Sequence, residues 1–312
     1  MLAWQQNLQQ RAAALRGRLL LDEPMARYTS WAVGGVADAV YRPADTDDLG
    51  QFMALLPSDI AIHWVGLGSN LLVRDAGVRG VVILLKAAMQ ELELKDDVVT
   101  AGAGVTCARL ARQVANWGYA DSAFFAGIPG TLGGALAMNA GAHGGETWAQ
   151  VIEVQVMDRS GSTEWLAPSE WQVGYRSVES ISQRECWFVA ARLQFAKGSA
   201  EAGIQAIREL QAHRAATQPI DQRSCGSVFR NPVGDHSARL IEVSGLKGLR
   251  MGGAQVSEKH ANFIVNADNA KAADIERLIN HVRSTVAEQH GVSLHPEVRI
   301  IGEAESGSEL AS

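Results

Sequence analysis

Hydrophobic residues recur along the chain at two spacings, one typical of helices and one of strands, and the two alternate. Before residue 200, helical spacing predicts helices over 3–20, 47–56 and 106–118. Alternating or short apolar runs predict strands at 36–42, 61–65, 80–86, 91–100, 151–158 and 186–195. This mixture of elements indicates an α+β organisation for the first part of the chain.

A second pattern begins after Lys197-Gly198-Ser199, where the composition shifts. It predicts helices over 201–217, 238–243 and 272–290, and strands at 262–265 and 292–301. The tail from residue 302 to 312 is small and polar, and we expect it to be disordered. The layout predicts an N-terminal α+β nucleotide-binding half and a smaller α/β module after about residue 200.

A glycine-rich segment interrupts both patterns. The 24 residues between Asp121 and Glu146 carry no formal charge, and seven of the chain's 31 glycines fall between Gly127 and Gly145. An ordinary core helix would not contain them, because each interior glycine costs about 0.5–1 kcal/mol relative to alanine. Glycine at this density indicates backbone that comes close to another group, often a phosphate that needs bare N–H donors.

Composition and charge exclude several classes of partner. A chain with 47% hydrophobic and 20% charged residues is an ordinary globular protein. Its net charge of −6 and lack of a Lys/Arg run argue against nucleic acid or an anionic membrane. Pro129 and the glycines break the apolar stretch around 123–142, so no membrane span is expected there. Three cysteines without CxxC spacing favour a reducing, cytoplasmic setting.

Four glycine-rich pieces are candidate phosphate-binding loops, and they lie at 29–35, 65–73, 101–105 and 127–141. None contains the complete GxGxxG fingerprint, and no GxxxxGK[ST] motif occurs. Any one of them alone is more typical of a turn or of tight packing. Together they favour an extended ligand such as a dinucleotide, held by backbone N–H groups and hydroxyls. Thr131 is expected to cap a short helix whose first N–H groups face the anion.

Seven motifs follow one another in order: TSWAVGG, VGLGSNLLV, GIPGTLGGALAMNAGAHGGE, GYRSVES, GSVFRNP, EKHANFIVN and HPEVRIIG. Over about residues 20–302, the chain resembles the UDP-N-acetylenolpyruvoylglucosamine reductases, flavoenzymes of peptidoglycan precursor synthesis. The resemblance implies an α+β fold of the vanillyl-alcohol-oxidase (PCMH) FAD-binding type in two subdomains, plus a smaller α/β substrate-binding domain. We expect the subdomains at 1–88 and at 89–200 with 296–312, and the substrate domain at 201–295.

The resemblance also implies the reaction. NADPH would reduce a bound FAD, and the flavin hydride would then attack the vinyl carbon of UDP-N-acetylglucosamine enolpyruvate to give UDP-N-acetylmuramate. The negative charge that develops beside the carboxylate needs stabilisation, and the enol needs a proton. The implied partners are this small-molecule nucleotide-sugar and no nucleic acid or membrane, with the protein a monomer.

Three residues match the catalytic positions of the family. Arg176 in GYRS would clamp the substrate carboxylate and stabilise the enolate-like charge. Ser227 in GSVFRNP would donate the proton, and Glu297 in HPEVR would stabilise the enol. Taken singly, these residues are more typical of a surface ion-pair arginine, a turn serine and an exposed strand-start carboxylate. The ordered set of motifs favours the functional interpretation.

The remaining matches concern ligand contacts. Expected FAD contacts are Thr29, Ser30, Gly66, Gly68, Ser69, Asn70, Gly127, Ile128, Pro129, Gly130, Thr131, Gly133, Gly134, Ala137, Asn139 and Gly141. Expected substrate contacts are Tyr175, Arg214, Gln218, Asn231, His260 and Asn262. We expect FAD to be non-covalent, because His63 lies on the strand side of its motif. No metal is expected, because the histidines form no HExxH or other ligand pattern. Cys225 is interpreted as structural, since the family chemistry has no thiol step.

The chain departs from the family in two respects. It has no insertion between Arg176 and Ser227 that would carry the substrate-covering tyrosine of the longer family form, so it is assigned to the shorter form. His295 stands two residues before Glu297, where an acidic residue is common. Three rival hypotheses remain at this point: another oxidase of the same FAD fold, a non-catalytic FAD-binding subunit, and a nucleotide-sugar sensor.

Overall fold

The computed structural model describes residues 3–305, and part of the predicted disordered tail, 306–312, lies outside that range. The chain divides into two compact units. Unit 1 consists of the chain up to Leu21, Ala39–Leu67 and Gly80–His213. Unit 2 consists of Asp22–Asp38, Gly68–Arg79 and the chain from Arg214 onward.

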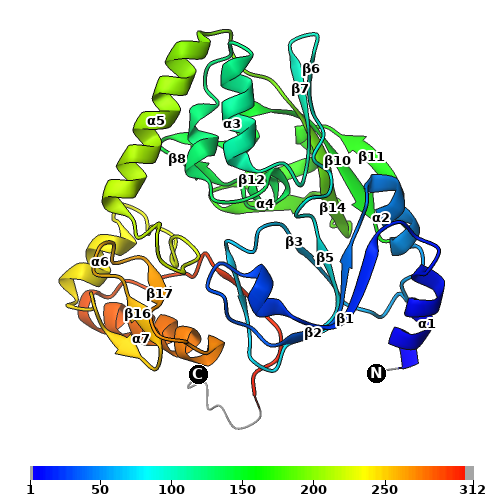
Figure 1. Ribbon diagram of the computed structural model, residues 1–312. Coiled ribbons are helices and arrows are strands. Elements are labelled where there is room, and N and C mark those ends of the chain that lie inside the picture. Colours follow the sequence, from blue (N-terminus) through cyan, green and yellow to red (C-terminus); the bar gives the residue numbers. More distant parts are fainter. Residues whose placement is uncertain (1–2, 306–312) are drawn as a thin grey trace. The chain divides into compact units, whose positions relative to one another are not determined.

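A five-stranded antiparallel sheet forms the centre of unit 1 (Figure 1). Its order is β11 (Thr163–Leu166), β10 (Val151–Asp158), β14 (Cys186–Leu193), β7 (Val98–Gly102) and β6 (Leu92–Lys95). Inward residues of the sheet share a core with α3 (Cys107–Asn116) and α4 (Leu132–Met138). The strand predicted at 151–158 is thus confirmed, and the one predicted at 186–195 is confirmed as far as Leu193.

A second core of unit 1 joins α1 (Ala3–Ala12) and α2 (Thr46–Met53) to strands of a four-stranded sheet. That sheet has the order β1 (Arg18–Pro24), β2 (Val36–Arg42), β5 (Val78–Leu84) and β3 (Ile62–Val65), with β3 parallel to β5. The predicted helix over 3–20 is wrong beyond Ala12. The Asp48 carboxylate accepts the backbone N–H groups of Arg16 at 2.8 Å and Gly17 at 3.1 Å, which draws the chain out of the helix and into β1.

Two small hairpins complete the part of unit 1 that matters for the site. One pairs β8 (Gly141–Ala142) with β9 (Gly145–Glu146), and the other pairs β12 (Trp171–Gly174) with β13 (Ser177–Ser180). The sequence pattern did not predict either, since their strands are too short to show a period. Helix α5 (Ala200–Thr217) follows, one residue longer than predicted.

Unit 2 is built on helix α7 (Ala272–His290), which packs on a small sheet and on helix α6 (Ser237–Val243) (Figure 1). The sheet has the order β15 (Arg250–Met251), β16 (Ala254–Val256) and β17 (Ile264–Asn266). Helix α7 matches its predicted bounds. The Asp75 carboxylate accepts the N–H groups of Ala272 and Ala273 at its first turn, and Gly291 ends it with a φ of +66°.

The last strand is shorter than predicted and pairs elsewhere. Strand β18 covers Arg299–Ile301 and runs parallel to β4 (Leu71–Val73), in the register Ile300 to Leu72. We expected residues 296–312 to join residues 89–200, whereas the observed pairing is with a segment inside 1–88. The three-part domain division otherwise stays a prediction.

Candidate functional site

In unit 1, strand β3 ends beside the start of helix α4. A Cβ placed on Gly66 would lie 2.3 Å from the Thr131 Oγ1, so only glycine fits there. Thr131 is buried, and its hydroxyl accepts the N–H of Gly134 at 3.5 Å, which confirms it as the helix cap. Two candidate phosphate loops, VGLGSN and GIPGTLGG, therefore meet at these residues.

The first N–H groups of α4 do not face an anion as expected. The N–H of Leu132 donates to the Val105 carbonyl at 2.8 Å, and that of Gly133 donates to the Ala103 carbonyl at 2.9 Å. The AGAGV piece thus runs alongside the cap and uses these donors itself. That part of the prediction is wrong, because a neighbouring loop satisfies groups that the sequence suggested were bare.

Packing within the protein explains most of the glycines. An added Cβ would lie 2.7 Å from the Ala142 Cβ at Gly127, 2.9 Å from the Ala103 Cβ at Gly133, and 2.5 Å from the Gly145 carbonyl oxygen at Gly141. Gly134 is different, because it is exposed and an added Cβ would meet no atom closer than 3.8 Å, the Thr131 Oγ1. Gly144 also has open space around it, but its φ of +85° favours glycine, so neither packing nor a positive φ explains the glycine at Gly134.

The other FAD candidates in this segment differ in their accessibility. Ile128 is buried, Pro129 is exposed, and Gly130 and Ala137 are half-buried. None of these residues carries a formal charge, so none of them would place one beside an aromatic or redox-active ligand.

In unit 2, the TSWAVGG and GSN loops lie together. Gly68 has a φ of +65°, an added Cβ would lie 1.8 Å from the Tyr28 carbonyl oxygen, and its own carbonyl accepts the Ser30 N–H at 3.1 Å. The Thr29 hydroxyl is turned inward, where it donates to the Val33 carbonyl at 2.7 Å. Asn70, which follows Ser69 in the loop, donates from Nδ2 to the Glu297 carbonyl at 3.0 Å. These contacts hold the GSN loop beside the start of the last strand.

Arg176 lies in unit 1 at the tip of the β12–β13 hairpin, where it forms a two-residue turn with the exposed Tyr175. Its φ is +54°, a conformation that costs a non-glycine residue about 1–2 kcal/mol. The guanidinium donates from Nη1 to the Asn139 carbonyl at 3.3 Å and from Nη2 to the Gly141 carbonyl at 3.0 Å. These two bonds join the GYRS motif to the end of the glycine-rich segment.

Ser227 and Glu297 lie in unit 2, on neighbouring extended segments. The Glu297 N–H donates to the Val228 carbonyl at 2.7 Å, and the Arg230 N–H donates to the His295 carbonyl at 2.9 Å. The backbone thus places the residue after Ser227 directly against Glu297. Both side chains are half-buried.

The EKHANF motif supports Ser227 from the other side. The Val228 N–H donates to the Asn262 carbonyl at 2.9 Å. The Asn262 side chain, 4% exposed, accepts the Phe229 N–H at 2.9 Å and donates to the Phe229 carbonyl at 2.8 Å. Because these bonds use its amide on the protein's own backbone, Asn262 acts here as a structural strut.

His260 precedes this strut and is half-buried. Burial lowers the pKa of its imidazole, so the ring is neutral at neutral pH. Its Nδ1 accepts the Asn262 N–H at 3.3 Å, which leaves the ring proton on Nε2. His260 is therefore a neutral donor next to the Ser227 segment.

Cys225 lies two residues before Ser227 and is not poised as a nucleophile. Burial raises the pKa of its thiol well above the usual range, and the charge of Glu297 raises it further. The structural interpretation made from the sequence agrees with this environment.

The other substrate candidates lie on the same unit. Arg214 donates from Nε to the Gln218 Oε1 at 3.2 Å, and burial lowers the pKa of the guanidinium. Asn231 is exposed, and its Oδ1 accepts the Ser237 N–H at the start of α6 at 3.1 Å. The sequence interpretation missed Arg230, whose Nε is buried without a hydrogen-bond partner in the part of the chain that the structure describes. The sequence could have indicated Arg230, because this residue lies inside the GSVFRNP motif.

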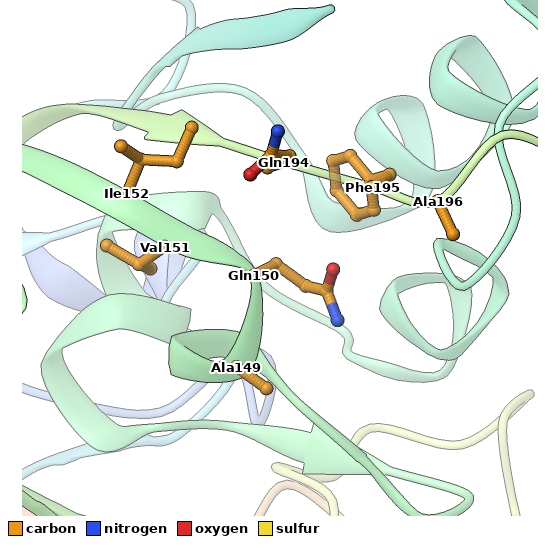
Figure 2. A pocket seen from close by; sticks show the side chains of 7 residues that line it. All are labelled: Ala149, Gln150, Val151, Ile152, Gln194, Phe195 and Ala196. Atoms are coloured by element: carbon orange, nitrogen blue, oxygen red, sulfur yellow. The ribbon is translucent and has the colours of Figure 1, made fainter.

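A shallow hollow of about 400 Å³ opens in unit 1 beside the ends of β10 and β14. Figure 2 shows its lining, in which Gln150 and Gln194 are the polar side chains and Ile152 and Phe195 the largest apolar ones. The backbone of these two glutamines is paired, with the Gln194 N–H donating to the Gln150 carbonyl at 2.9 Å. None of the predicted site residues lines this hollow, and it holds no charged group.

Two protein families match parts of this chain, and the first of them indicates which cofactor it binds. Residues 37–167 match the FAD binding domain family, and residues 218–301 match the family described as UDP-N-acetylenolpyruvoylglucosamine reductase, C-terminal domain. The fold and the glycine-rich loops are therefore those of an FAD-containing oxidoreductase, and the expected α+β fold of the PCMH type is confirmed.

Curated relatives extend over nearly the whole chain. A UDP-N-acetylenolpyruvoylglucosamine reductase from Alkalilimnicola ehrlichii is 55% identical over 93% of this chain and 97% of its own length. One from Methylococcus capsulatus is 54% identical over 95% and 97%. The crystal structure of the Thermus caldophilus enzyme is 31% identical, with a TM-score of 0.78 over 92% of this chain and 100% of that one. The chain belongs to the UDP-N-acetylenolpyruvoylglucosamine reductase family.

Proposed function

We propose that this enzyme reduces UDP-N-acetylglucosamine enolpyruvate to UDP-N-acetylmuramate, with NADPH as reductant and FAD bound non-covalently. Family membership carries the substrate assignment. The Glu297 N–H donates to the carbonyl of Val228, the residue after Ser227, at 2.7 Å, and this proximity of the two chain segments supports the chemistry. We further propose that the protein works as a cytoplasmic monomer.

The FAD would be held by two sets of residues. Gly66, Thr131 and the open surface at Gly134 supply one set, and Ser30, Gly68, Ser69 and Asn70 supply the other. These loops fit the group because only glycine is tolerated at Gly66 and Gly68, so no side chain of either residue covers the loop backbone. When bound, the flavin supplies the hydride for the vinyl carbon of the substrate.

Three side chains then act on the substrate. Arg176 binds the carboxylate and stabilises the charge that develops beside it, because a guanidinium offers paired donors to a carboxylate. Ser227 donates its hydroxyl proton to the enolate carbon. A serine suffices as this acid because the acceptor is strongly basic. Glu297 lies beside Ser227 and stabilises the enol form through a hydrogen bond.

Cationic and amide groups of unit 2 are proposed to bind the nucleotide diphosphate. Arg214 and Gln218 already form a pair at the end of α5, and Arg230 adds a buried Nε next to Asn231. We keep Tyr175, Asn231 and His260 as substrate contacts, and we assign Asn262 the structural role that its bonds to Phe229 describe.

The decisive experiment separates the two half-reactions of the purified holoenzyme. The Ser227→Ala variant should be reduced by NADPH at the normal rate, while its reoxidation by the enolpyruvyl substrate slows about 10²–10⁴-fold. Ser284→Ala is the matched control, since Ser284 is an exposed helix residue of the same unit. Equal slowing of both steps would contradict the proposed role of Ser227. Substrate that fails to stimulate NADPH oxidation would contradict the function itself.

A further inference from the structure

The hairpin that carries Arg176 is held by an asparagine whose side chain points away from solvent. Asn139 ends helix α4 with a φ of +44° and is 2% exposed. Its Nδ2 donates to the Gly174 carbonyl at 3.2 Å and to the Glu146 Oε2 at 3.0 Å. Its Oδ1 accepts the Trp148 N–H at 3.1 Å. All three bonds hold protein segments, so the side chain of Asn139 serves the protein rather than a ligand.

These segments surround Arg176 on two sides. Gly174 is paired with Ser177 across the two-residue turn that contains Arg176, so fixing Gly174 fixes the base of that turn. The backbone carbonyl of the same Asn139 accepts one of the guanidinium N–H groups at 3.3 Å. Asn139 therefore forms hydrogen bonds both with the backbone just before Arg176 and with the guanidinium of Arg176.

Glu146 completes the arrangement from strand β9. Glu146 pairs with Gly141, whose carbonyl accepts the second N–H of the Arg176 guanidinium. The Glu146 carboxylate accepts a hydrogen bond from the Asn139 Nδ2. The left-handed φ of Arg176 makes this support necessary, because an arginine leaves that conformation readily when nothing holds it.

We infer that Asn139, with Glu146 as its hydrogen-bond acceptor, is a positioning residue that sets the guanidinium of Arg176 for reaction with the substrate carboxylate. This inference rests on the proposed catalytic role of Arg176. It assigns no contact between the Asn139 side chain and any ligand.

A double-mutant cycle on the holoenzyme tests the inference, with each half-reaction followed by flavin absorbance. Arg176→Ala should slow reoxidation by the enolpyruvyl substrate about 10²–10³-fold. Asn139→Ala should slow the same step about 10²-fold, since misplacement by about 1 Å has effects of that size. The double variant should be no slower than Arg176→Ala alone, because Asn139 acts only through the arginine. Reduction by NADPH should stay unchanged in all three.

Substitutions at Glu146 give a second measurement that leaves the Asn139 side chain intact. Glu146→Ala should slow reoxidation less than Asn139→Ala, and Glu146→Gln should restore it because an amide oxygen also accepts the bond. Glu179→Ala, an exposed position on the same hairpin as Arg176, is the matched control.

The outcomes separate this inference from the proposed function. If the losses from Asn139→Ala and Arg176→Ala multiply in the double variant, Asn139 acts independently and the inference is overturned. If Arg176→Ala slows reoxidation and Asn139→Ala does not, the inference alone fails. If Arg176→Ala itself leaves reoxidation at the wild-type rate, the role of Arg176 in the proposed function fails and the inference fails with it.

Discussion

The Asn262 strut gives the sharpest prediction about stability, because it can be tested without substrate. Its amide accepts the Phe229 N–H at 2.9 Å and donates to the Phe229 carbonyl at 2.8 Å, in a position that is 4% exposed. Asn262→Ala leaves both backbone groups buried without a partner. Each such group costs about 1–3 kcal/mol, so the variant should lose about 2–6 kcal/mol of unfolding free energy.

That loss is a large part of the 5–15 kcal/mol typical of a folded domain. It is measured by chemical denaturation of the holoprotein and of protein stripped of FAD, with both midpoint and slope compared between variants. Gln289→Ala, an exposed position on α7, is the control and should change stability by less than about 0.5 kcal/mol.

Asn262→Asp refines the test. A carboxylate keeps an acceptor for the Phe229 N–H but places a second oxygen against the Phe229 carbonyl, so burial and repulsion should raise the pKa of the introduced acid. Its protonated form can donate that bond. The deficit relative to wild type should therefore be large at neutral pH and shrink as the pH falls. A loss below about 1 kcal/mol for Asn262→Ala, or a deficit for Asn262→Asp that grows in acid, would refute the strut argument.

Three further predictions concern unit 1. Burial alone would raise the pKa of Asp48, but bonds from the Ala44 N–H, the Tyr41 hydroxyl and the N–H groups of Gly17 and Arg16 outweigh it and lower the pKa. A lowered pKa gives stability that is present above the unfolded value, about 3.9, and is lost as the pH falls through the folded value. Asp48→Asn should therefore lose about 1–3 kcal/mol at pH 7 and show a weaker acid dependence in denaturation at pH 2–7; an unchanged dependence would count against this account. Gly66→Ala should destabilise the protein by about 1–3 kcal/mol through its contact with Thr131. Gly134→Ala should stabilise the apoprotein by about 0.5–1 kcal/mol while weakening FAD binding, as judged by melting with and without FAD; unaltered FAD affinity would show that no ligand needs that surface.

The regular elements were largely predictable because their signals are local. Strand β10 and helix α7 match their predicted bounds, and Thr131 and Gly291 end or begin helices as their residue types indicate. The ordered motifs were likewise enough to predict an FAD-containing reductase, since each motif is a short run of specific residues. Composition and the glycine count pointed to the segment where close backbone packing occurs.

Tertiary structure decided what each of those residues touches. The prediction of a helix over 3–20 was wrong because the Asp48 carboxylate, 32 residues away from Arg16, accepts the Arg16 N–H and ends the helix. The AGAGV piece accepts the donors at the start of α4, and the side-chain amides of Asn139 and Asn262 bond to other groups of the protein. The amino-acid sequence by itself determined many of the longer elements, the cofactor class and the family. Only the folded chain decided which polar groups remain for chemistry, because burial forces each buried donor and acceptor to find a partner that is distant in the sequence.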